Sequence, residues 1–158
     1  MSAAGDEHLR RAIELAREHM EAGHGGPFGA VIVQESAIVA EGWNQVTSSN
    51  DPTAHAEVVA IRRACATLQT FSLSECVLFT SCEPCPMCLG AAYWAGVKQI
   101  VFAASRHDAA AAGFSDEFLY RELPLEVSER SIPTVQRLAE EGRGPFDAWM
   151  AKEDRIPY

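Results

Sequence analysis

Two short motifs carry the side chains with the clearest chemical potential. The first is His55-Ala56-Glu57, and the second is Pro84-Cys85-Pro86-Met87-Cys88. Two cysteines three residues apart at the start of a helix direct both sulfurs toward one point, and the positive end of the helix favours their thiolate form. Together with one imidazole they form a three-ligand set of nitrogen and sulfur, which in catalytic zinc sites leaves a fourth position open. The sequence therefore predicts a zinc site formed by His55, Cys85 and Cys88.

Glu57 stands two residues after His55, which places it about 200° around a helix axis from the imidazole. We therefore do not expect Glu57 to bind the same metal, but it could lie beside a metal-bound water and move protons, first as a base and then as an acid. The pattern His-x-Glu followed by Pro-Cys-x-x-Cys is typical of zinc-dependent nucleobase deaminases, in which the glutamate carries the protons. The motifs predict hydrolytic deamination with Glu57 as the catalytic residue.

The cysteine motif alone leaves alternatives open. A single Cys-x-x-Cys also occurs in redox sites and in closed structural zinc sites, and a closed site needs a fourth ligand. Cys82 stands three residues before Cys85 and could be that ligand, but its place at the end of an apolar strand favours a buried thiol. Cys65 and Cys76 fall on apolar positions and are expected in the core. A catalytically inactive, zinc-stabilised module stays possible, although such a site has no need of Glu57.

The motifs must be positioned by an alternation of helices and strands. Apolar spacing predicts helices over residues 6–22, 54–68, 86–95, 107–112 and 145–153, and strands over 28–33, 37–43, 76–81, 99–104 and 125–127. Asp6 is the expected N-cap of the first helix, and Gly23 its expected stop. This order predicts an α/β fold, a three-layer α/β/α sandwich around a mixed sheet of about five strands. With 158 residues we expect one domain, residues 1–158.

Composition restricts the class of partner. The chain has 22 acidic and 13 basic residues, and its formal net charge of -9 disfavours nucleic acid as a partner. No apolar run approaches the roughly 20 residues that span a membrane. The polar stretch 1–7 does not resemble a signal peptide. Five cysteines in a chain too large to need disulfides favour a reducing compartment, so we expect a cytoplasmic protein.

Three segments, 25–33, 50–57 and 81–91, resemble the cytidine-deaminase-like superfamily. Together with residues 112–118 and the terminal Tyr158, they are similar more narrowly to the small bacterial guanine deaminases, and the resemblance covers nearly the whole chain. It implies hydrolysis of guanine at C2 to xanthine and ammonia, with one Zn²⁺ per subunit. It also implies a homodimer in which the C-terminal helix and tail, about 145–158, cap the active site of the partner subunit.

The same resemblance implies six substrate contacts. Asn44 hydrogen-bonds the base, Phe28 stacks on it, Trp94 walls the pocket, Asp116 accepts from its N–H or amino donors, Tyr158 completes the site, and Ala56 also lines it. An aspartate acceptor suits guanine and repels the N3 acceptor of cytosine. All of these side chains except that of Ala56 also have a purely structural alternative. These are a turn at Asn44, core packing at Phe28 and Trp94, a helix N-cap at Asp116, and a frayed terminus at Tyr158.

Three relatives of the same fold remain alternative functions. The tRNA adenosine deaminases share the run 52–57, but they grip an RNA backbone, for which a net charge of -9 is unsuited. Guanosine deaminase differs only in whether the pocket admits a ribose. Cytosine deaminase of the fungal type shares the zinc motif and is disfavoured by Asp116.

Overall fold

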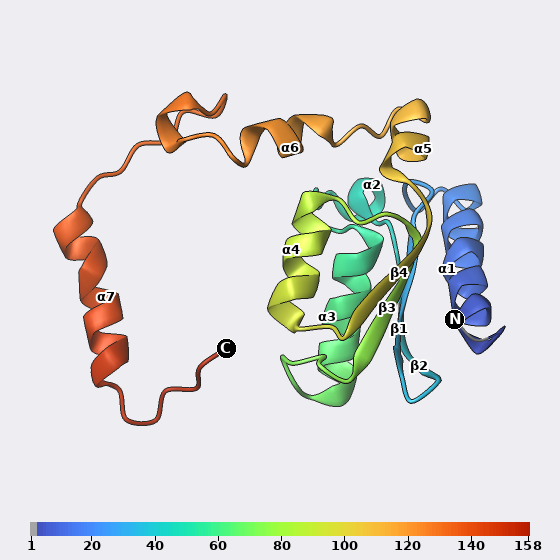
Figure 1. Cartoon of the computed structure of the whole chain (residues 1–158), viewed down its shortest axis with the longest axis horizontal. Coiled ribbons are helices and arrows are strands. Elements are labelled where there is room, and N and C mark those ends of the chain that lie inside the picture. Colours follow the sequence, from blue (N-terminus) through green and yellow to red (C-terminus); the bar gives the residue numbers. More distant parts are fainter. Residues whose placement is uncertain (1–2) are drawn as a thin grey trace. The chain divides into compact units, whose positions relative to one another are not determined.

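A computed structural model describes residues 3–158, with side chains from residue 5 onward. Met1 and Ser2, the start of the polar stretch noted above, lie outside the described residues. The helices are α1 (Ala3–Glu21), α2 (Val46–Ser49), α3 (Ala56–Leu68), α4 (Pro86–Ala95), α5 (Arg106–Ala111), α6 (Glu117–Glu122) and α7 (Ala139–Ala151), with a 3₁₀ turn η1 (Val127–Glu129). The strands are β1 (Gly29–Gln34), β2 (Ala37–Trp43), β3 (Cys76–Cys82) and β4 (Gln99–Ala104) (Figure 1).

The strands form one mixed sheet in the order β2-β1-β3-β4. β1 pairs antiparallel with both β2 and β3, whereas β3 and β4 are parallel. Within the described residues the sheet has four strands, so the expected count of about five is wrong. The strand expected over 125–127 does not form, because this three-residue run finds no partner strand and leads into η1 instead.

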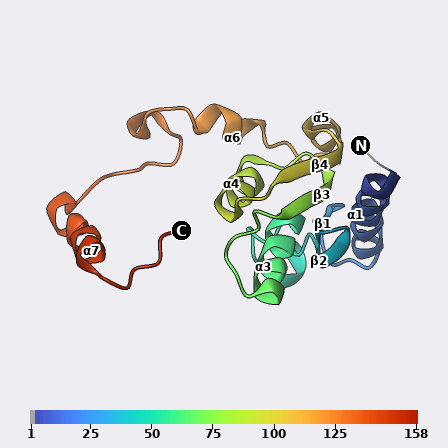
Figure 2. The same ribbon diagram turned by 60° about the horizontal axis from the view of Figure 1, so that its bottom comes forward.

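Two helical layers cover the two faces of the sheet (Figure 2). Alternate residues of β1 enter different cores, as the period of a strand requires. Ala30 and Ile32 join the core under α3 and α4, whereas Val31 and Val33 join Leu15 of α1 on the other face. The three-layer α/β/α sandwich is therefore confirmed.

β2 packs closely against the start of α3, the helix at which the His55-Ala56-Glu57 motif lies. A β-carbon at Gly42 would lie 2.3 Å from the carbonyl oxygen of Ala56 and 2.6 Å from the backbone nitrogen of Ala60. Only a residue without a side chain lets the strand and the helix approach this closely. The end of β2 is thereby held against the first turn of α3.

Several element boundaries agree with the sequence. The bounds of β2, α4 and β4 are those expected. α1 begins at Ala3, so Asp6 lies in its first turn and is not the N-cap. α3 begins two residues later than expected, because His55 keeps an extended backbone. The short helix α2 lies in a segment for which no helix was expected, and α7 begins at Ala139 rather than at residue 145.

The chain divides into two compact units, of which the first ends at Asp116 and the second spans Glu117–Tyr158. The first contains the sheet and both of its core clusters. The second contains α6, η1 and α7, and none of these three elements has a buried residue. None of the helices in residues 3–158 combines the length and apolar character that crossing a bilayer requires.

Candidate metal centre and active site

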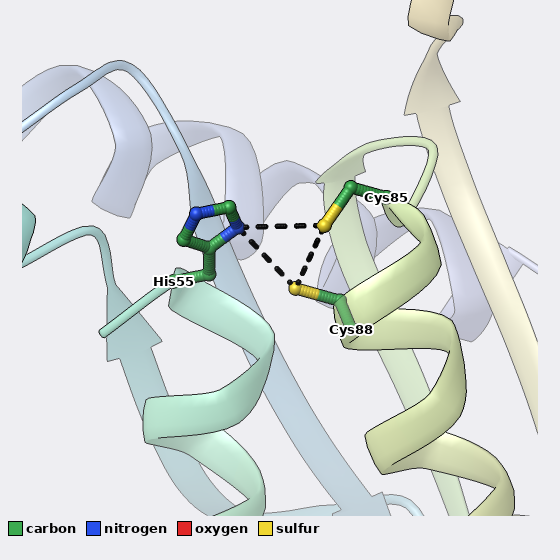
Figure 3. Close-up of side chains that lie close together, drawn as sticks. All are labelled: His55, Cys85 and Cys88. Atoms are coloured by element: carbon green, nitrogen blue, oxygen red, sulfur yellow. Dashed lines mark hydrogen bonds between the residues drawn. The ribbon is translucent and has the colours of Figure 1, made fainter. Parts of the chain in front are cut away.

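The predicted metal ligands stand at the beginnings of two neighbouring helices. His55 is the N-cap of α3, Cys85 is the N-cap of α4, and Cys88 is the third residue of α4. Figure 3 shows the three side chains pointing toward one another from these helix ends. Because each helix presents the positive end of its dipole here, thiolates are stabilised at this point.

The three donor atoms form a nearly equilateral triangle. His55 Nδ1 lies 3.6 Å from Cys85 Sγ and 3.5 Å from Cys88 Sγ, and the two sulfurs are 3.6 Å apart. Tetrahedral zinc, with bonds of about 2.3 Å to sulfur and about 2.05 Å to nitrogen, sets its donors about 3.5–3.8 Å apart. Among the described residues, this is the only cluster of three or more His, Cys, Asp or Glu close enough to hold a metal ion. The residues fit zinc in both donor type and spacing.

The two sulfurs share their protons unequally. The hydrogen bond between the sulfurs is the largest cause that lowers the pKa of Cys85 to about 4, and the imidazole of His55 lowers it further. The same contact raises the pKa of Cys88. Cys85 is therefore a thiolate at neutral pH, and binding of a metal ion displaces the remaining proton from Cys88.

Glu57 is the buried carboxylate of the site. Glu57 is 5% exposed, and burial is the largest cause that raises the pKa of its carboxyl group above the usual value of a glutamate. It lies close enough to Cys88 for their charges to interact. A carboxyl group that holds a proton readily beside a metal site is suited to carry protons in catalysis.

Thr80 is a contact of Glu57 that the sequence reasoning missed. Its hydroxyl lies on β3 and donates a 3.4 Å hydrogen bond to Glu57 Oε1. Leu78, two residues earlier on the same strand, lies in the core under α3. Because strand residues alternate between faces, Thr80 lies on the same side of the sheet as Leu78, the side that α3 covers. A polar residue at a strand position that faces the core could have pointed to Thr80 from the sequence alone.

Asn44 follows β2 directly and is buried. Its Oδ1 accepts hydrogen bonds from the backbone N–H groups of Gly26, at 3.1 Å, and Val46, at 3.2 Å. The next residue, Gln45, donates its N–H to the carbonyl of Ala54 at 2.9 Å, immediately before His55. Through its neighbour Gln45, Asn44 is thus linked to the segment that leads into His55. Asn44 also forms a turn, as its structural alternative predicted.

Phe28 and Ala56 lie in the same unit as the metal ligands. Phe28 is half-buried and meets Phe114 edge to face, with ring centroids 5.1 Å apart. Ala56 is the first residue of α3 and is fully buried. Their roles toward a substrate stay predictions.

The other three predicted substrate residues lie in less enclosed positions. Trp94 lies on α4 and is 76% exposed, so it is not part of the core. Asp116 is half-buried at the end of the first unit, directly before α6. Tyr158 ends the second unit and is 86% exposed. Their contacts with a substrate stay predictions.

Cys82 is not a member of the ligand triangle. It is buried at the end of β3, and its thiol donates a 3.6 Å hydrogen bond to the carbonyl oxygen of Ser105. Burial is the largest cause that raises its pKa to about 11, which keeps it protonated. These observations favour the buried thiol over the fourth ligand.

Residues 3–104 match the family model described as the cytidine and deoxycytidylate deaminase zinc-binding region. The matched region contains all three members of the ligand triangle and Glu57. The chain belongs to this family. The cofactor of this family is zinc, and His55, Cys85 and Cys88 form a possible site for it.

Two further comparisons extend beyond the zinc-binding region. Guanine deaminase of Bacillus subtilis (strain 168) is 58% identical over 150 residues, which cover 95% of this chain and 96% of that protein. The X-ray structure of guanine deaminase from Bacillus subtilis matches with a TM-score of 0.95 and 53% identity, covering 100% of this chain and 99% of the other. The expected resemblance to bacterial guanine deaminases is confirmed.

A deaminase of another substrate class matches over a shorter span. The tRNA-specific adenosine deaminase of Haemophilus influenzae is 41% identical over 106 residues, covering 66% of this chain and 61% of that protein. The likeness to guanine deaminase therefore covers much more of the chain.

Proposed function

We propose that this chain hydrolyses guanine to xanthine and ammonia. The observation that carries the proposal is the sequence and structural match to a guanine deaminase, which extends over nearly the full length of the chain and includes both of its units. The triangle of His55, Cys85 and Cys88 with the buried Glu57 beside it supplies the required chemical groups. An inactive zinc-stabilised module has no use for a buried, proton-holding Glu57, so this alternative is disfavoured.

The role of each side chain in the reaction follows from its chemistry. When bound by the triangle, zinc supplies a water acidified to a pKa of about 7. Glu57 takes a proton from the attacking water and delivers it to the ring nitrogen beside C2, while an oxygen–carbon bond forms at C2. Glu57 then carries the second water proton to the amino group, the carbon–nitrogen bond breaks, and ammonia leaves. Thr80 donates a hydrogen bond to Oε1 of Glu57 and so helps to orient this carboxyl group.

A substrate panel tests the reaction. Zinc-loaded protein is incubated with guanine, guanosine, cytosine and adenine, and ammonia is measured together with the deaminated product. We expect guanine to be preferred over cytosine and adenine in kcat/KM by at least about a hundredfold, because a site built for its donors leaves buried groups unpaired with these two bases. Guanosine presents the same donors, so its turnover shows whether the pocket admits a ribose. A preference for guanosine, cytosine or adenine would replace guanine as the proposed substrate. If none of the four compounds is turned over, the proposal that this chain is a deaminase is contradicted.

We further propose that the second unit, Glu117–Tyr158, caps the active site of another copy of this chain in a homodimer. The unit has helices without buried residues and exposes large apolar side chains, which need a protein surface to cover them. Among the most exposed are Ile132, Val135, Leu138, Phe146, Met150 and Ile156. In this proposal Tyr158 reaches the substrate of the partner subunit.

Complementation between two inactive variants tests this exchange. One variant carries Glu57→Gln with an intact tail, and the other lacks residues 145–158 but keeps Glu57. If tails act between subunits, co-expression restores activity, because the intact tail covers the functional site of its partner. If each tail covers its own site, the mixed dimer stays inactive. Light scattering of the wild type provides the oligomeric state, and a monomer would contradict the proposal.

The compartment is proposed on chemical grounds. All five cysteines are unpaired in the structure, and two of them belong to the cluster that could hold a metal ion. Thiols of this kind persist in a reducing environment. We therefore propose the cytoplasm, which localisation of a fluorescent fusion in cells would check.

A further inference from the structure

The loop that carries Cys85 to the metal triangle is short. β3 ends at Cys82, and Cys85 is already the N-cap of α4, so that only Glu83 and Pro84 lie between them. The ring of Pro84 fixes its own φ angle and restricts the residue before it to an extended backbone. A displacement of Glu83 is therefore passed on to Cys85 with little room for adjustment.

Three hydrogen bonds join the start of this loop to the junction between β4 and α5. The backbone N–H of Glu83 donates to the carbonyl oxygen of Ala104 at 2.8 Å, and the thiol of Cys82 donates to that of Ser105 at 3.6 Å. The third bond uses a side chain of the loop as acceptor. Oε2 of Glu83 accepts from the backbone N–H of Arg106 at 3.0 Å.

The junction is itself held in place by a capping box. Ser105 is the N-cap of α5, its backbone N–H donates to Oδ2 of Asp108 at 2.8 Å, and the N–H of Asp108 donates to Oγ of Ser105 at 3.3 Å. Arg106 is the first residue of this helix. An N–H at this position has no acceptor within its own helix. Its bond to Glu83 therefore ties the metal-ligand loop to a fixed point without weakening α5.

We propose that Glu83 is a positioning residue of the metal centre, whose carboxylate, bound to the N–H of Arg106, holds the loop so that Cys85 can share one zinc ion with His55 and Cys88. Partners that orient the ligands of a metal typically change its affinity by about ten- to a hundredfold. The inference goes beyond the proposed function, because it applies whichever base the chain deaminates. It rests on the ligand triangle shown in Figure 3.

Two exchanges at Glu83 separate its hydrogen bond from its charge. Glu83→Gln removes the charge but keeps an oxygen that can accept from the N–H, whereas Glu83→Ala removes the acceptor. Metal-free protein is titrated with Zn²⁺ in competition with a chelator of known affinity. We expect Glu83→Ala to bind zinc about ten- to a hundredfold more weakly than the wild type, and Glu83→Gln to stay within about threefold of it.

Two results of this titration would overturn the proposal. Wild-type zinc affinity in Glu83→Ala would show that the carboxylate does not position the loop. An equal loss in both variants would show that the negative charge attracts the metal ion and that the hydrogen bond is not needed.

The donor side of the bond can be removed as well. Arg106→Pro deletes the N–H, and proline suits the first position of a helix. The backbone of Ser105, with φ -83° and ψ 163°, is the extended conformation that a residue before proline adopts. Arg106→Ala is the reference, because it loses the same side chain but keeps the N–H. We expect the proline variant to bind zinc about tenfold more weakly than the alanine variant.

Combining the exchanges tests whether the N–H acts through Glu83. In a Glu83→Ala background the proline and alanine variants of residue 106 should bind zinc equally, to within about twofold, because the acceptor is already gone. A difference between them that persists in this background would exclude positioning through the bond. The Arg106 pair decides the question even if Glu83→Ala does not fold.

A glutamate at the other end of the same strand provides the matched control. Glu75 directly precedes β3, as Glu83 directly follows it, and Glu75→Ala should retain wild-type zinc affinity. The Tm of each metal-free variant is measured alongside. If zinc affinity merely follows this Tm across all variants, the effect is a general loss of stability and the proposal is wrong.

Failure of this proposal differs from failure of the proposed function. Zinc-loaded wild type that does not deaminate guanine contradicts the function and leaves the role of Glu83 intact. Wild type that binds zinc with the same affinity as both Glu83→Ala and Arg106→Pro contradicts only the positioning role.

Discussion

The two units of the chain differ in what stabilises them. The first packs a helical layer on each face of its sheet, and its core side chains Leu15, Ile32 and Leu78 are almost completely buried. In the second, the three elements have no buried residue, and Phe146 is 72% exposed. The first unit is thus stabilised by its own core, whereas the second leaves large apolar side chains exposed, which is the feature on which its proposed capping role rests.

The units differ in chemistry as well. The ligand triangle, Glu57 and Asn44 all belong to the first unit. The second contributes the predicted substrate contact Tyr158. Changes in the first unit should therefore remove the reaction, and changes in the second should weaken it while leaving the metal in place.

Loss of a zinc ligand should have the largest effect. Serine is a poor zinc ligand, so Cys88→Ser should lower bound zinc below about 0.1 per chain and turnover of guanine by at least about a thousandfold. Cys82→Ser is the matched control and should retain one zinc per chain, because Cys82 lies outside the ligand triangle. Metal analysis and an ammonia assay measure both. Full zinc content in Cys88→Ser would break the assignment of the ligands.

Removal of the last two residues should have a smaller effect and should sharpen the contrast between the units. Without Pro157 and Tyr158 we expect turnover to fall about ten- to a hundredfold, because a predicted substrate contact is lost. Zinc content and the Tm of the protein should stay at the wild-type values, since the core of the first unit is unchanged. Wild-type turnover in the truncated protein would remove Tyr158 from the active site.

Local sequence rules predicted the first unit well. α4 begins at Pro86, whose ring suits the first helical position, and ends at Ala95 as expected. The convergence of Cys85 and Cys88 was also predictable, because cysteines three apart at a helix start converge by local geometry alone. These features depend on short stretches of chain, which is the range over which sequence patterns are informative. The approach of His55, 30 residues before Cys85, was predicted from the combination of the two motifs and not from local geometry.

The failures have physical causes of longer range. Residues 125–127 have the apolar content of a strand, but a strand needs a neighbour to pair with, and the local pattern does not contain one. The partnership between Thr80 and Glu57 joins residues 23 apart in the chain. The hydrogen bond from the Gly26 N–H to Asn44 Oδ1 joins residues 18 apart in the chain and depends on the lack of a side chain at Gly25. Such contacts are set by tertiary packing.

A surface ion pair of the first unit should have the smallest effect. Arg11 binds the carboxylate of Glu41 through two hydrogen bonds of 2.7 and 3.1 Å, and this contact is the largest cause that lowers the pKa of Glu41. Because the pair is about a third exposed, Glu41→Gln should lower the free energy of unfolding by only about 0.5–1 kcal/mol. Urea unfolding measures it, with the exposed Glu75→Gln as control.

The pH dependence of this pair has a defined sign. Since the folded pKa of Glu41 lies below its usual value, the stabilisation is complete above the unfolded pKa of about 4.5. It is lost as the pH falls through the folded pKa, where the carboxylate takes up a proton. The difference between wild type and Glu41→Gln should therefore shrink in acid. A difference that grows as the pH falls would contradict the ion pair.

The most direct test of the account is the reaction of Glu57→Gln protein whose zinc content has been measured. The amide has nearly the shape of the carboxyl group but cannot carry protons, so the account predicts one zinc per chain, an unchanged fold and a loss of guanine turnover of about a hundred- to ten-thousandfold. The exposed Glu75→Gln should remain fully active. Normal release of ammonia from guanine by zinc-loaded Glu57→Gln would show that another group carries the protons, and would contradict the mechanism.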